Sequence, residues 1–358
     1  MTTLLSLLED ILHPRPTQVL ATLVQVRGSS YRRPGARILM DPDGIRGGVI
    51  SAGCMESDLA ARVTATLAQG TPQLVKYDMG SELDRVWGTG MGCEGQADIL
   101  LAPLTEAYDS TWAQKAREAH HERRPGVLLT TFASPDPRQV GRALWWDPTC
   151  PEGTLETPQL AAAREALASE KPSTLVLEGV SILVEPVLPP IALWIYGAGE
   201  NARPLATLAI QLGWEVGMLD HRPALAAPGR FPGARHVLSG SQEALAAALT
   251  EDARSAAVVM SHVFDPDKAM LRHMLTRSIP YVGLQGSRQR SAKLLKELEQ
   301  EGFPLTEAQR HRLHVPMGLN LGAESPEIIA LAVLAEIQAT LNGHAPLPLR
   351  ELEGSIHG

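Results

Sequence analysis

The sequence predicts an α/β protein with a mixed α/β domain first and a doubly wound, parallel-sheet domain second. Its 358 residues are enough for about two domains. In the second half, apolar strands alternate with helical segments, which is typical of parallel βαβ units. In the first half, strands also meet at tight turns, and the strand pattern then ends at Pro186, Pro189 and Pro190. We therefore expect a boundary there, with domains over residues 1–187 and 188–358.

Composition and charge exclude several classes of protein. Hydrophobic residues make up 44% of the chain and charged residues 20%, as in ordinary soluble proteins. The net charge is −8 and no long run of Lys or Arg occurs, so we expect no nucleic-acid partner. No apolar run approaches about 18 residues, so we expect no membrane span. The opening MTTLLSLLEDIL resembles a short amphipathic helix rather than a signal peptide, and we expect a cytoplasmic protein.

The first domain is expected to hold several strands and few helices. After the opening helix, β-branched and apolar residues predict strands over Val19–Val26 and Ala36–Met40. The turn Asp41–Gly44 (DPDG) predicts a hairpin, because Pro presets φ and Gly accepts a positive φ. Further along we expect helices over Trp112–Glu122 and within 147–171. Strands are expected over Gln73–Asp78, Ala97–Ala102, Gly126–Phe132, Gly141–Trp146 and Ser173–Val187, the last range as a pair of strands that meet at Glu178-Gly179.

The stretch Gly47–Leu67 (GGVISAGCMESDLAARVTATL) places a thiol at the start of a helix. Val49 and Ile50 are expected to end a buried strand, and apolar residues then recur at helical spacing. Cys54 lies just before or within the first helical turn, where backbone N–H groups and the helix dipole lower a thiol pKa and favour an anion. The alternative is that Cys54 is a small buried hydrophobic residue.

Two loops that precede this helix carry Gly, Ser and Arg, a combination that can hold a phosphate or another anion. Their polar members are Ser29, Ser30, Arg32, Arg33 and Arg46. The alternative is that the small residues only form turns and the arginines are solvated.

A later glycine-rich segment, Trp87–Gly95, contains Gly92 and Cys93 and permits close backbone approach. With Cys54 and Cys150 the cysteines form an odd set without a C-x-x-C pair, which argues against a disulfide framework. They are too few for a structural zinc site unless histidines join them.

The second domain begins with a dinucleotide-binding pattern. The apolar strand Ile191–Tyr196 leads into G-A-G-E-N-A at 197–202, and a helix follows over Arg203–Leu212. The next strand, Trp214–Leu219, ends in Asp220, the position at which Rossmann domains hold a ribose hydroxyl. We therefore expect a Rossmann-like domain. Its nucleotide contacts are assigned to Gly197, Gly199, Ala202 and Asp220.

Charge beside this loop is mixed. Glu200 puts a negative charge next to the phosphate position, which opposes binding of a pyrophosphate. Arg203 or Arg222 is expected to offset that charge, and Arg222 would also favour a 2′-phosphate.

Later strands end in polar residues that are expected to line the same crevice. The strand Ala256–Met260 is followed by Ser261, His262, Asp265 and Asp267, and the strand Pro280–Leu284 is followed by Gly286, Ser287 and Arg288. In a doubly wound sheet, loops after the carboxyl ends of strands form the ligand crevice. We therefore add His262, Gly286, Ser287 and Arg288 to the nucleotide contacts. The alternative for His262 is a helix cap or a place at the core edge.

The remaining helices are expected over Ser241–Leu249, Lys268–Thr276, Gln289–Glu299 and Ile328–Leu341. Ser325 and Pro326 predict the start of the last one. This strongly apolar helix and the opening helix have two open uses, core packing or the surface of a homodimer, and we expect core packing.

Several segments resemble the XdhC/CoxI family of xanthine dehydrogenase accessory factors, in the family's order and along nearly the whole chain. The segments of the first half are GSSYRRPGARILM, GGVISAGCMESDL and GTGMGCEGQADILLAPL. Those of the second half are IYGAGENARPLA, VVMSH, YVGLQGSR and PMGLNLGAESPEIIALAVLAEI. The resemblance implies an XdhC/CoxI-like N-terminal domain followed by a Rossmann-like domain.

The resemblance also implies a carrier rather than an enzyme. Such a protein binds molybdenum cofactor (molybdopterin), protects it while a cysteine desulfurase sulfurates it, and hands it to an apo molybdenum hydroxylase. Cys54 matches the family cysteine tied to cofactor binding, and Cys93 matches a GCGG-like turn. Departures from the family pattern are Ala52, Glu94 and Glu200, the last where histidine is usual. Metal ligation, persulfide carriage and contact with the pterin stay open for Cys54.

The loops of the first half and the family resemblance together predict a site for molybdenum cofactor, and the Rossmann-like half leaves alternative functions open. The cofactor contacts are expected from Ser29, Ser30, Arg33, Ser51, Gly53, Cys54, Glu56, Gly92 and Cys93. No metal site is predicted beyond contact of Cys54 with molybdenum. The alternative functions are an NAD(P)-dependent oxidoreductase, with the N-terminal half as substrate domain and His262 as acid/base, and a nucleotide-sensing scaffold. The sequence shows no Ser/His/Asp set or paired carboxylates, so catalysis is not required.

Overall fold

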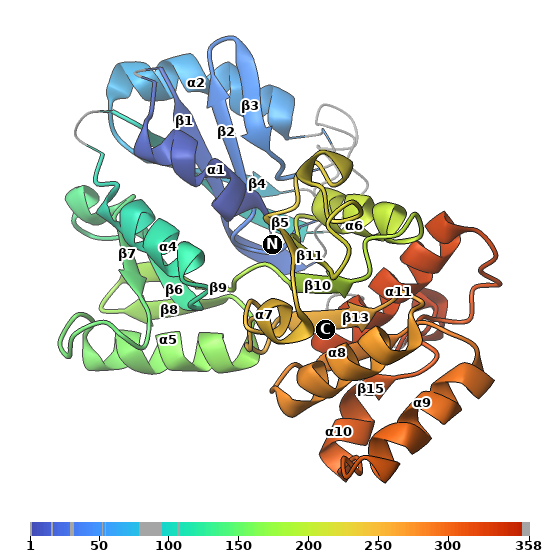
Figure 1. Ribbon diagram of the computed structural model, residues 1–358. Coiled ribbons are helices and arrows are strands. Elements are labelled where there is room, and N and C mark those ends of the chain that lie inside the picture. Colours follow the sequence, from blue (N-terminus) through green and yellow to red (C-terminus); the bar gives the residue numbers. More distant parts are fainter. Residues whose placement is uncertain are drawn as a thin grey trace. The chain divides into compact units, whose positions relative to one another are not determined.

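The computed structural model describes residues 2–15, 17–28, 32–51, 53, 55–78, 95–105 and 108–352. The chain divides into two compact units, Met1–Pro189 and Pro190–Gly358. Unit 1 is built on antiparallel sheets and unit 2 on a parallel one, which confirms the predicted fold class (Figure 1).

The first sheet of unit 1 has the strand order β3-β2-β1-β5-β4, and neighbouring strands run antiparallel. Its strands are β1 (Val19–Gly28), β2 (Arg37–Asp41), β3 (Gly44–Gly48), β4 (Gln73–Asp78) and β5 (Gly95–Pro103). The DPDG hairpin is confirmed, because Asp41 and Gly44 are paired across β2 and β3. Val49 and Ile50, expected to end a strand, instead follow β3, and the N–H of Val49 adds one more bond to the Arg37 carbonyl, at 2.9 Å.

The second sheet of unit 1 has the order β7-β6-β9-β8. Its strands are β6 (Gly126–Ala133), β7 (Ala143–Trp146), β8 (Ser173–Leu177) and β9 (Val180–Val187). Between β8 and β9, Glu178 and Gly179 have φ of 49° and 82°. A two-residue turn with both φ positive matches the twist of its strands, which explains the break predicted at this dipeptide.

Helices cover the sheets of unit 1 according to the alternation of strand residues. They are α1 (Thr2–Leu12), α2 (Glu56–Gln69), α4 (Thr111–His121) and α5 (Thr157–Ser169). Leu20 and Leu39 pack with α1 and α4, whereas their neighbours Val19 and Ile38 pack with α2. This follows from the period of two along a strand. Because α1 buries its apolar side chains, including Leu8, in this cluster, that face is used within the unit.

An ion pair joins the two sheets of unit 1. The guanidinium of Arg37 on β2 donates to both carboxylate oxygens of Glu185 on β9, at 2.9 and 2.6 Å, and to the Gly35 carbonyl at 2.8 Å. The Arg37 side chain is 2% exposed. A Cβ at Gly35 would lie 2.6 Å from a Glu185 oxygen, so glycine makes room for this pair.

The sheet of unit 2 has the order β12-β11-β10-β13-β14-β15 with parallel neighbours. Its strands are β10 (Ala192–Tyr196), β11 (Glu215–Asp220), β12 (His236–Ser239), β13 (Ser255–Val259), β14 (Tyr281–Leu284) and β15 (Leu313–His314). This is the strand order of a dinucleotide-binding fold. The edge strands β12 and β15 were not predicted, because they are short and only partly buried and so lack a continuous apolar run.

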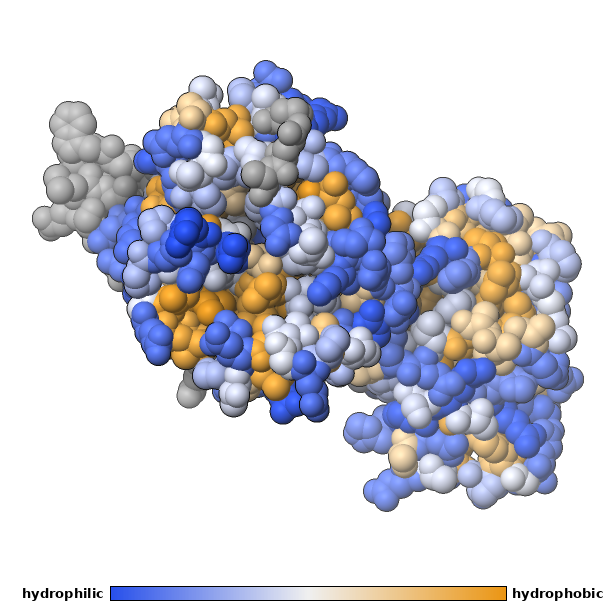
Figure 2. Space-filling model, turned by 90° about the vertical axis from the view of Figure 1, so that its left-hand side faces the viewer, coloured by the Kyte–Doolittle hydropathy of each residue, from blue (hydrophilic) through white to orange (hydrophobic). Residues whose placement is uncertain are grey.

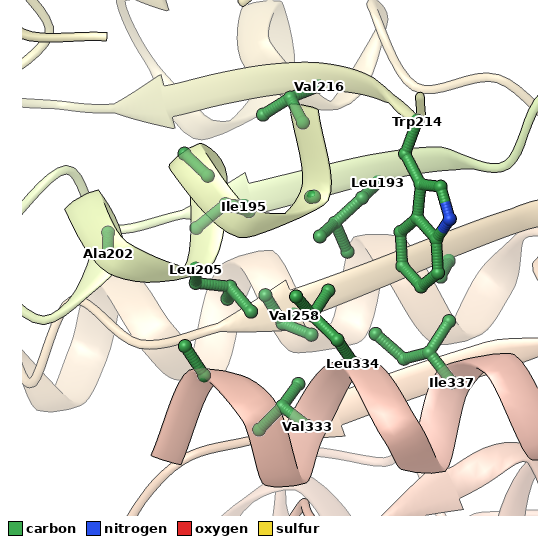
Figure 3. Close-up of a cluster of buried hydrophobic side chains, with 14 of the residues drawn as sticks. Leu193, Ile195, Ala202, Leu205, Trp214, Val216, Val258, Val333, Leu334 and Ile337 are labelled. Atoms are coloured by element: carbon green, nitrogen blue, oxygen red, sulfur yellow. The ribbon is translucent and has the colours of Figure 1, made fainter. Parts of the chain in front are cut away.

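Helices flank both faces of this sheet. They are α6 (Ala202–Gln211), α7 (Gln242–Ala246), α8 (Phe264–Thr276), α9 (Arg288–Gln300), α10 (Glu307–Arg312) and α11 (Pro326–Leu341). Figure 3 shows side chains of α6 and α11 meeting Leu193, Ile195 and Val258 of the sheet in one buried cluster. The expected core packing of α11 is thus seen on that face, and α7, α8 and α9 pack against the opposite face.

The predicted ends of α6, α9 and α11 lie within two residues of the observed ends. Helix α7 ends earlier than predicted, α8 begins earlier, and the short helix α10 was not predicted. The Ser325 side chain accepts the N–H of Ile328, so the predicted N-cap is confirmed. Helix α8 begins at Phe264, so Asp265 and Asp267, expected in a loop after the strand, lie in its first turn. Acidic residues are favourable there because of the helix dipole.

In the part of the chain that the structure describes, no helix combines the length and apolarity needed to cross a membrane. Figure 2 shows one face of the molecule, where mostly hydrophilic side chains surround separate apolar patches.

Candidate functional sites

The turn that leads into α2 holds most of the described residues of the predicted cofactor site. Residues predicted for this site that lie outside the described residues are Ser29, Ser30, Cys54, Gly92 and Cys93. Those that the structure describes are Arg33, Ser51, Gly53 and Glu56.

The Ser51 side chain organises this turn. Its Oγ accepts the backbone N–H groups of Gly53 and Met55, at 3.3 and 3.1 Å, and it donates to the Glu56 carboxylate. Gly53 has a φ of 109°, and a Cβ there would meet no atom within 4 Å, so the backbone conformation alone favours glycine. The backbone on both sides of position 54 is therefore tied to one buried hydroxyl.

Glu56 closes the same turn from the helix. Its Oε1 accepts the N–H groups of Ser51 and Ile50, at 2.7 and 3.3 Å, and the residue is 7% exposed. Burial alone would raise the pKa of Glu56, but the hydrogen bonds from Ser51 and Ile50 outweigh it and lower the pKa. A carboxylate therefore already uses the Ser51 amide, so an anionic ligand at this turn must bind through other donors.

The two arginines of the preceding loops, Arg46 and Arg33, differ in their surroundings. Arg46 pairs with Asp41, and with Asp43 at 3.2 Å. The hydrogen bond from Arg46 lowers the pKa of Asp41, which keeps that partner anionic. Arg33 is exposed on the loop before β2. The charge of Arg46 is thus used within the β2–β3 hairpin, whereas Arg33 lies at the surface.

The Gly197 loop of unit 2 approaches the neighbouring strand closely. Gly197 has a φ of 114°, and a Cβ there would clash with the backbone of Ser261. A Cβ at Gly199 would instead meet no atom within 4 Å, and its φ is not one that requires glycine. Packing within the described residues therefore does not require glycine at position 199, as expected of a glycine that lets a ligand approach the backbone. Ala202 is buried at the start of α6 and packs in the core.

The carboxylate of Asp220, predicted to hold a ribose, already accepts hydrogen bonds from other groups of the protein. It is fully buried and accepts the Ala198 N–H at 2.7 Å, and it also accepts three bonds from Arg222, at 2.8 to 2.9 Å. Burial alone would raise the pKa of Asp220, but the bonds from Arg222 and Ala198 outweigh it and lower the pKa. A ribose hydroxyl would therefore have to displace Arg222.

The negative charge of Glu200 is offset by one of the two candidate cations, Arg203. Arg203 pairs with Glu200 at 3.1 Å, as expected. Arg222 pairs with Asp220 instead, and the second partner of Glu200 is Arg230, at 2.6 Å. The sequence offered no signal for Arg230, because 30 residues separate it from Glu200.

The ends of β13 and β14 lie next to each other, as their parallel pairing requires. His262 is exposed, with a left-handed φ of 62° that is strained for histidine. Ser287 caps α9 by accepting the N–H of Arg290 at 3.2 Å, and Arg288 is exposed in the first turn. The polar residues of these two loops are thus brought to one edge of the sheet.

These features define a two-domain α/β protein whose second domain has the Rossmann strand order and glycine loop. The model of the XdhC and CoxI family matches residues 13–78, and the model of the XdhC Rossmann domain matches residues 193–337. The chain belongs to the XdhC and CoxI family.

Similar proteins support this assignment over the full length. A Bacillus subtilis (strain 168) protein named as a probable xanthine dehydrogenase subunit is 30% identical over 338 residues, 94% of this chain and 96% of that protein. The molybdenum cofactor insertion chaperone PaoD of Escherichia coli (strain K12) is 24% identical over 89% of this chain and 82% of its own. A crystal structure described as a xanthine dehydrogenase from Bacillus halodurans shares the fold, with a TM-score of 0.75, 24% identity and coverage of 96% and 97%.

Proposed function

We propose that this protein is a maturation factor for molybdenum cofactor. It holds the cofactor while a cysteine desulfurase sulfurates it, and then delivers it to an apo molybdenum hydroxylase of the xanthine dehydrogenase type. The observation that carries the proposal is family membership along the whole chain, together with PaoD, a relative named as a molybdenum cofactor insertion chaperone.

The turn before α2 supports the proposal from the residues upward. The Ser51 hydroxyl accepts the N–H groups of Gly53 and Met55, on either side of the cysteine at position 54, and itself donates to Glu56. A thiolate is a suitable ligand for a thiophilic metal such as molybdenum. In our proposal Cys54 retains the cofactor, and Arg33, with Ser29 and Ser30, meets its phosphate.

Retention of the cofactor by Cys54 is tested with a pair of cysteine variants. The wild-type chain, Cys54→Ala and Cys150→Ala are each incubated with molybdenum cofactor and passed over gel filtration. Cys150 is the matched control, since it lies in the same unit, is partly buried and accepts the Asp147 N–H. We expect Cys54→Ala to lose bound molybdenum and pterin while Cys150→Ala keeps both. Equal retention by the two variants would remove Cys54 from the proposal.

The sulfuration step has its own test. The cofactor-loaded chain is mixed with a cysteine desulfurase and cysteine, and a terminal sulfur on the bound cofactor is measured by mass spectrometry. We expect sulfur on the cofactor only when the chain and the desulfurase are both present. Sulfuration at the same rate without the chain would exclude this role.

An NAD(P)-dependent oxidoreductase is the second candidate, favoured by the open space at Gly199. Against it stands the engagement of Asp220 by Arg222 and Ala198. Titration of the chain with NAD and NADP discriminates, because this candidate requires binding of at least one and the carrier function requires neither.

A further inference from the structure

Polar atoms without partners gather where β14 runs into α9. Gln285 Oε1, Arg290 Nη1 and Ser291 Oγ are shielded from solvent and make no hydrogen bond within the described residues. Ser291 is 2% exposed. Buried polar atoms nearly always have a partner, and leaving one unmet is unfavourable. Three such atoms within seven residues point to a partner that is not part of the described chain.

Two of these atoms border the same space above Gly286. A Cβ built on Gly286 would lie 3.5 Å from Arg290 Nη1 and 3.6 Å from Ser291 Oγ, in ordinary contact with both. Gly286 also has a φ of 154°, which favours glycine. The space that a side chain would fill is therefore lined by a guanidinium nitrogen and a hydroxyl, both able to donate.

The guanidinium is held in place from its other side. Asp267 is fully buried and accepts Arg290 Nη2 at 2.7 Å, and it also accepts the Ser261 hydroxyl. The pair orients Arg290 across the loops that follow β13 and β14, while Nη1 stays available. A rigidly held guanidinium suits recognition of an oxyanion.

One further cation, Lys293, lies with Arg290 beside the ring of Phe264. The cations of Arg290, Lys293 and Lys268 lie 5.7, 5.1 and 5.9 Å from the ring centre of Phe264. Lys268 pairs with Glu297 and Glu301, but within the described residues Lys293 has no carboxylate partner. The thirteen-residue helix α9 begins at Arg288, and its N-terminus adds partial positive charge.

We propose that the start of α9 binds the phosphate group of a small molecule, with Arg290 Nη1 and Ser291 Oγ as donors at Gly286. A phosphate has enough oxygens to accept both donors and amides of the first helical turn. Gln285 Oε1 is an acceptor, so it can receive the hydroxyl of a protonated phosphate. This site follows β14, at the same edge of the sheet as the Gly197 loop after β10, and it does not rest on the proposed cofactor function.

Binding of inorganic phosphate and of AMP to the full chain, measured by calorimetry at constant ionic strength with acetate as the comparison anion, tests the proposal. We expect both phosphates to bind and acetate to bind at least about tenfold more weakly. Tighter binding of AMP than of phosphate identifies a nucleotide as the source of the phosphate, and equal binding identifies phosphate alone as the recognised group. Both support the site, and absence of binding by both, or equal binding of acetate, overturns it.

Variants separate this site from a structural role of the same residues. Ser291→Ala removes a hydroxyl without a partner among the described residues, so thermal stability should stay unchanged. If this hydroxyl binds no ligand, phosphate affinity should stay unchanged as well. The proposal instead predicts that phosphate affinity falls about tenfold. Arg290→Lys keeps a positive charge beside Asp267, but a single ammonium group cannot replace both Nη1 and Nη2. We therefore expect a similar loss of phosphate affinity.

Ser278→Ala is the matched control, because Ser278 is an exposed serine of the same unit that precedes β14, at the opposite end of that strand. Its backbone N–H, which alanine keeps, donates to Glu251 at 3.2 Å. This variant should bind phosphate as the wild type does. Wild-type affinity in Ser291→Ala would overturn the assignment even if Arg290→Lys failed to fold. Cys54→Ala should keep phosphate binding, so failure of the cofactor proposal is distinguishable from failure of this one.

Discussion

Glu56 is a carboxylate whose surroundings favour its charged form. Three hydrogen bonds from Ser51 and Ile50 reach it at the start of α2, where the helix dipole also favours an anion. Its first role is therefore to shape the turn that contains position 54, and any contact with a ligand is added to that role.

Glu56→Gln should destabilise unit 1 by about 1–3 kcal/mol, because a neutral amide accepts these bonds more weakly. The pKa of Glu56 is lowered on folding, so its contribution is present above the ordinary carboxyl pKa and is lost as pH falls through the folded value. Urea unfolding measured between about pH 7 and pH 3 should show a smaller loss of stability in Glu56→Gln. Glu165→Gln, an exposed change on α5, should behave as the wild type. Identical pH profiles for Glu56→Gln and wild type would refute this role.

At the scale of the element, the pair of Arg37 and Glu185 joins the two sheets of unit 1. Both groups are largely buried and their contact is bidentate. Removing one partner leaves a buried charge without its counter-ion, which is more harmful than removing both.

Arg37→Met should therefore lower the free energy of unfolding by about 3–5 kcal/mol, and the double variant with Glu185→Leu should recover part of that loss. The measurement is a double-mutant cycle by urea unfolding. If Arg37→Met lowered the free energy of unfolding by less than about 1 kcal/mol, as expected for a surface ion pair, the pair would not be what joins the two sheets.

In the parallel sheet of unit 2, a glycine makes room for an aromatic ring. Gly217 on β11 is the register partner of Trp194 on β10, and a Cβ at Gly217 would overlap the indole ring. Gly217→Ala should destabilise unit 2 by about 1–3 kcal/mol through overpacking. Gly229→Ala is the control, because a Cβ there meets no atom within 4 Å. Equal thermal midpoints for the two variants would show that the indole moves aside at little cost.

Elements were predictable from the sequence where the signal is local. The Glu178-Gly179 turn and the Ser325 cap act over a few residues, and both follow from backbone preferences. The pairing of Arg37 with Glu185 joins residues 148 positions apart, so no local pattern reports it. The same holds for Asp267 and Arg290, which the fold brings together from the ends of two strands.

At the scale of the whole molecule, the order of motifs carries more information than any motif alone. The glycine loop predicted a Rossmann-like domain, and the strand order confirms it. The roles of its residues were less predictable, because Asp220 and Ala198 bond to each other rather than standing free for a ligand. Family membership along both units, together with a relative named as a molybdenum cofactor insertion chaperone, is what supports the proposed role in cofactor maturation.

Transfer of molybdenum is the most direct test of the proposed carrier function. The chain is loaded with cofactor, mixed with an apo hydroxylase of the xanthine dehydrogenase type, and separated from it by gel filtration. We expect molybdenum and pterin to leave the chain and appear with the hydroxylase, together with hydroxylase activity. If molybdenum never travels with the chain, or if free cofactor activates the hydroxylase equally well, the carrier function is contradicted.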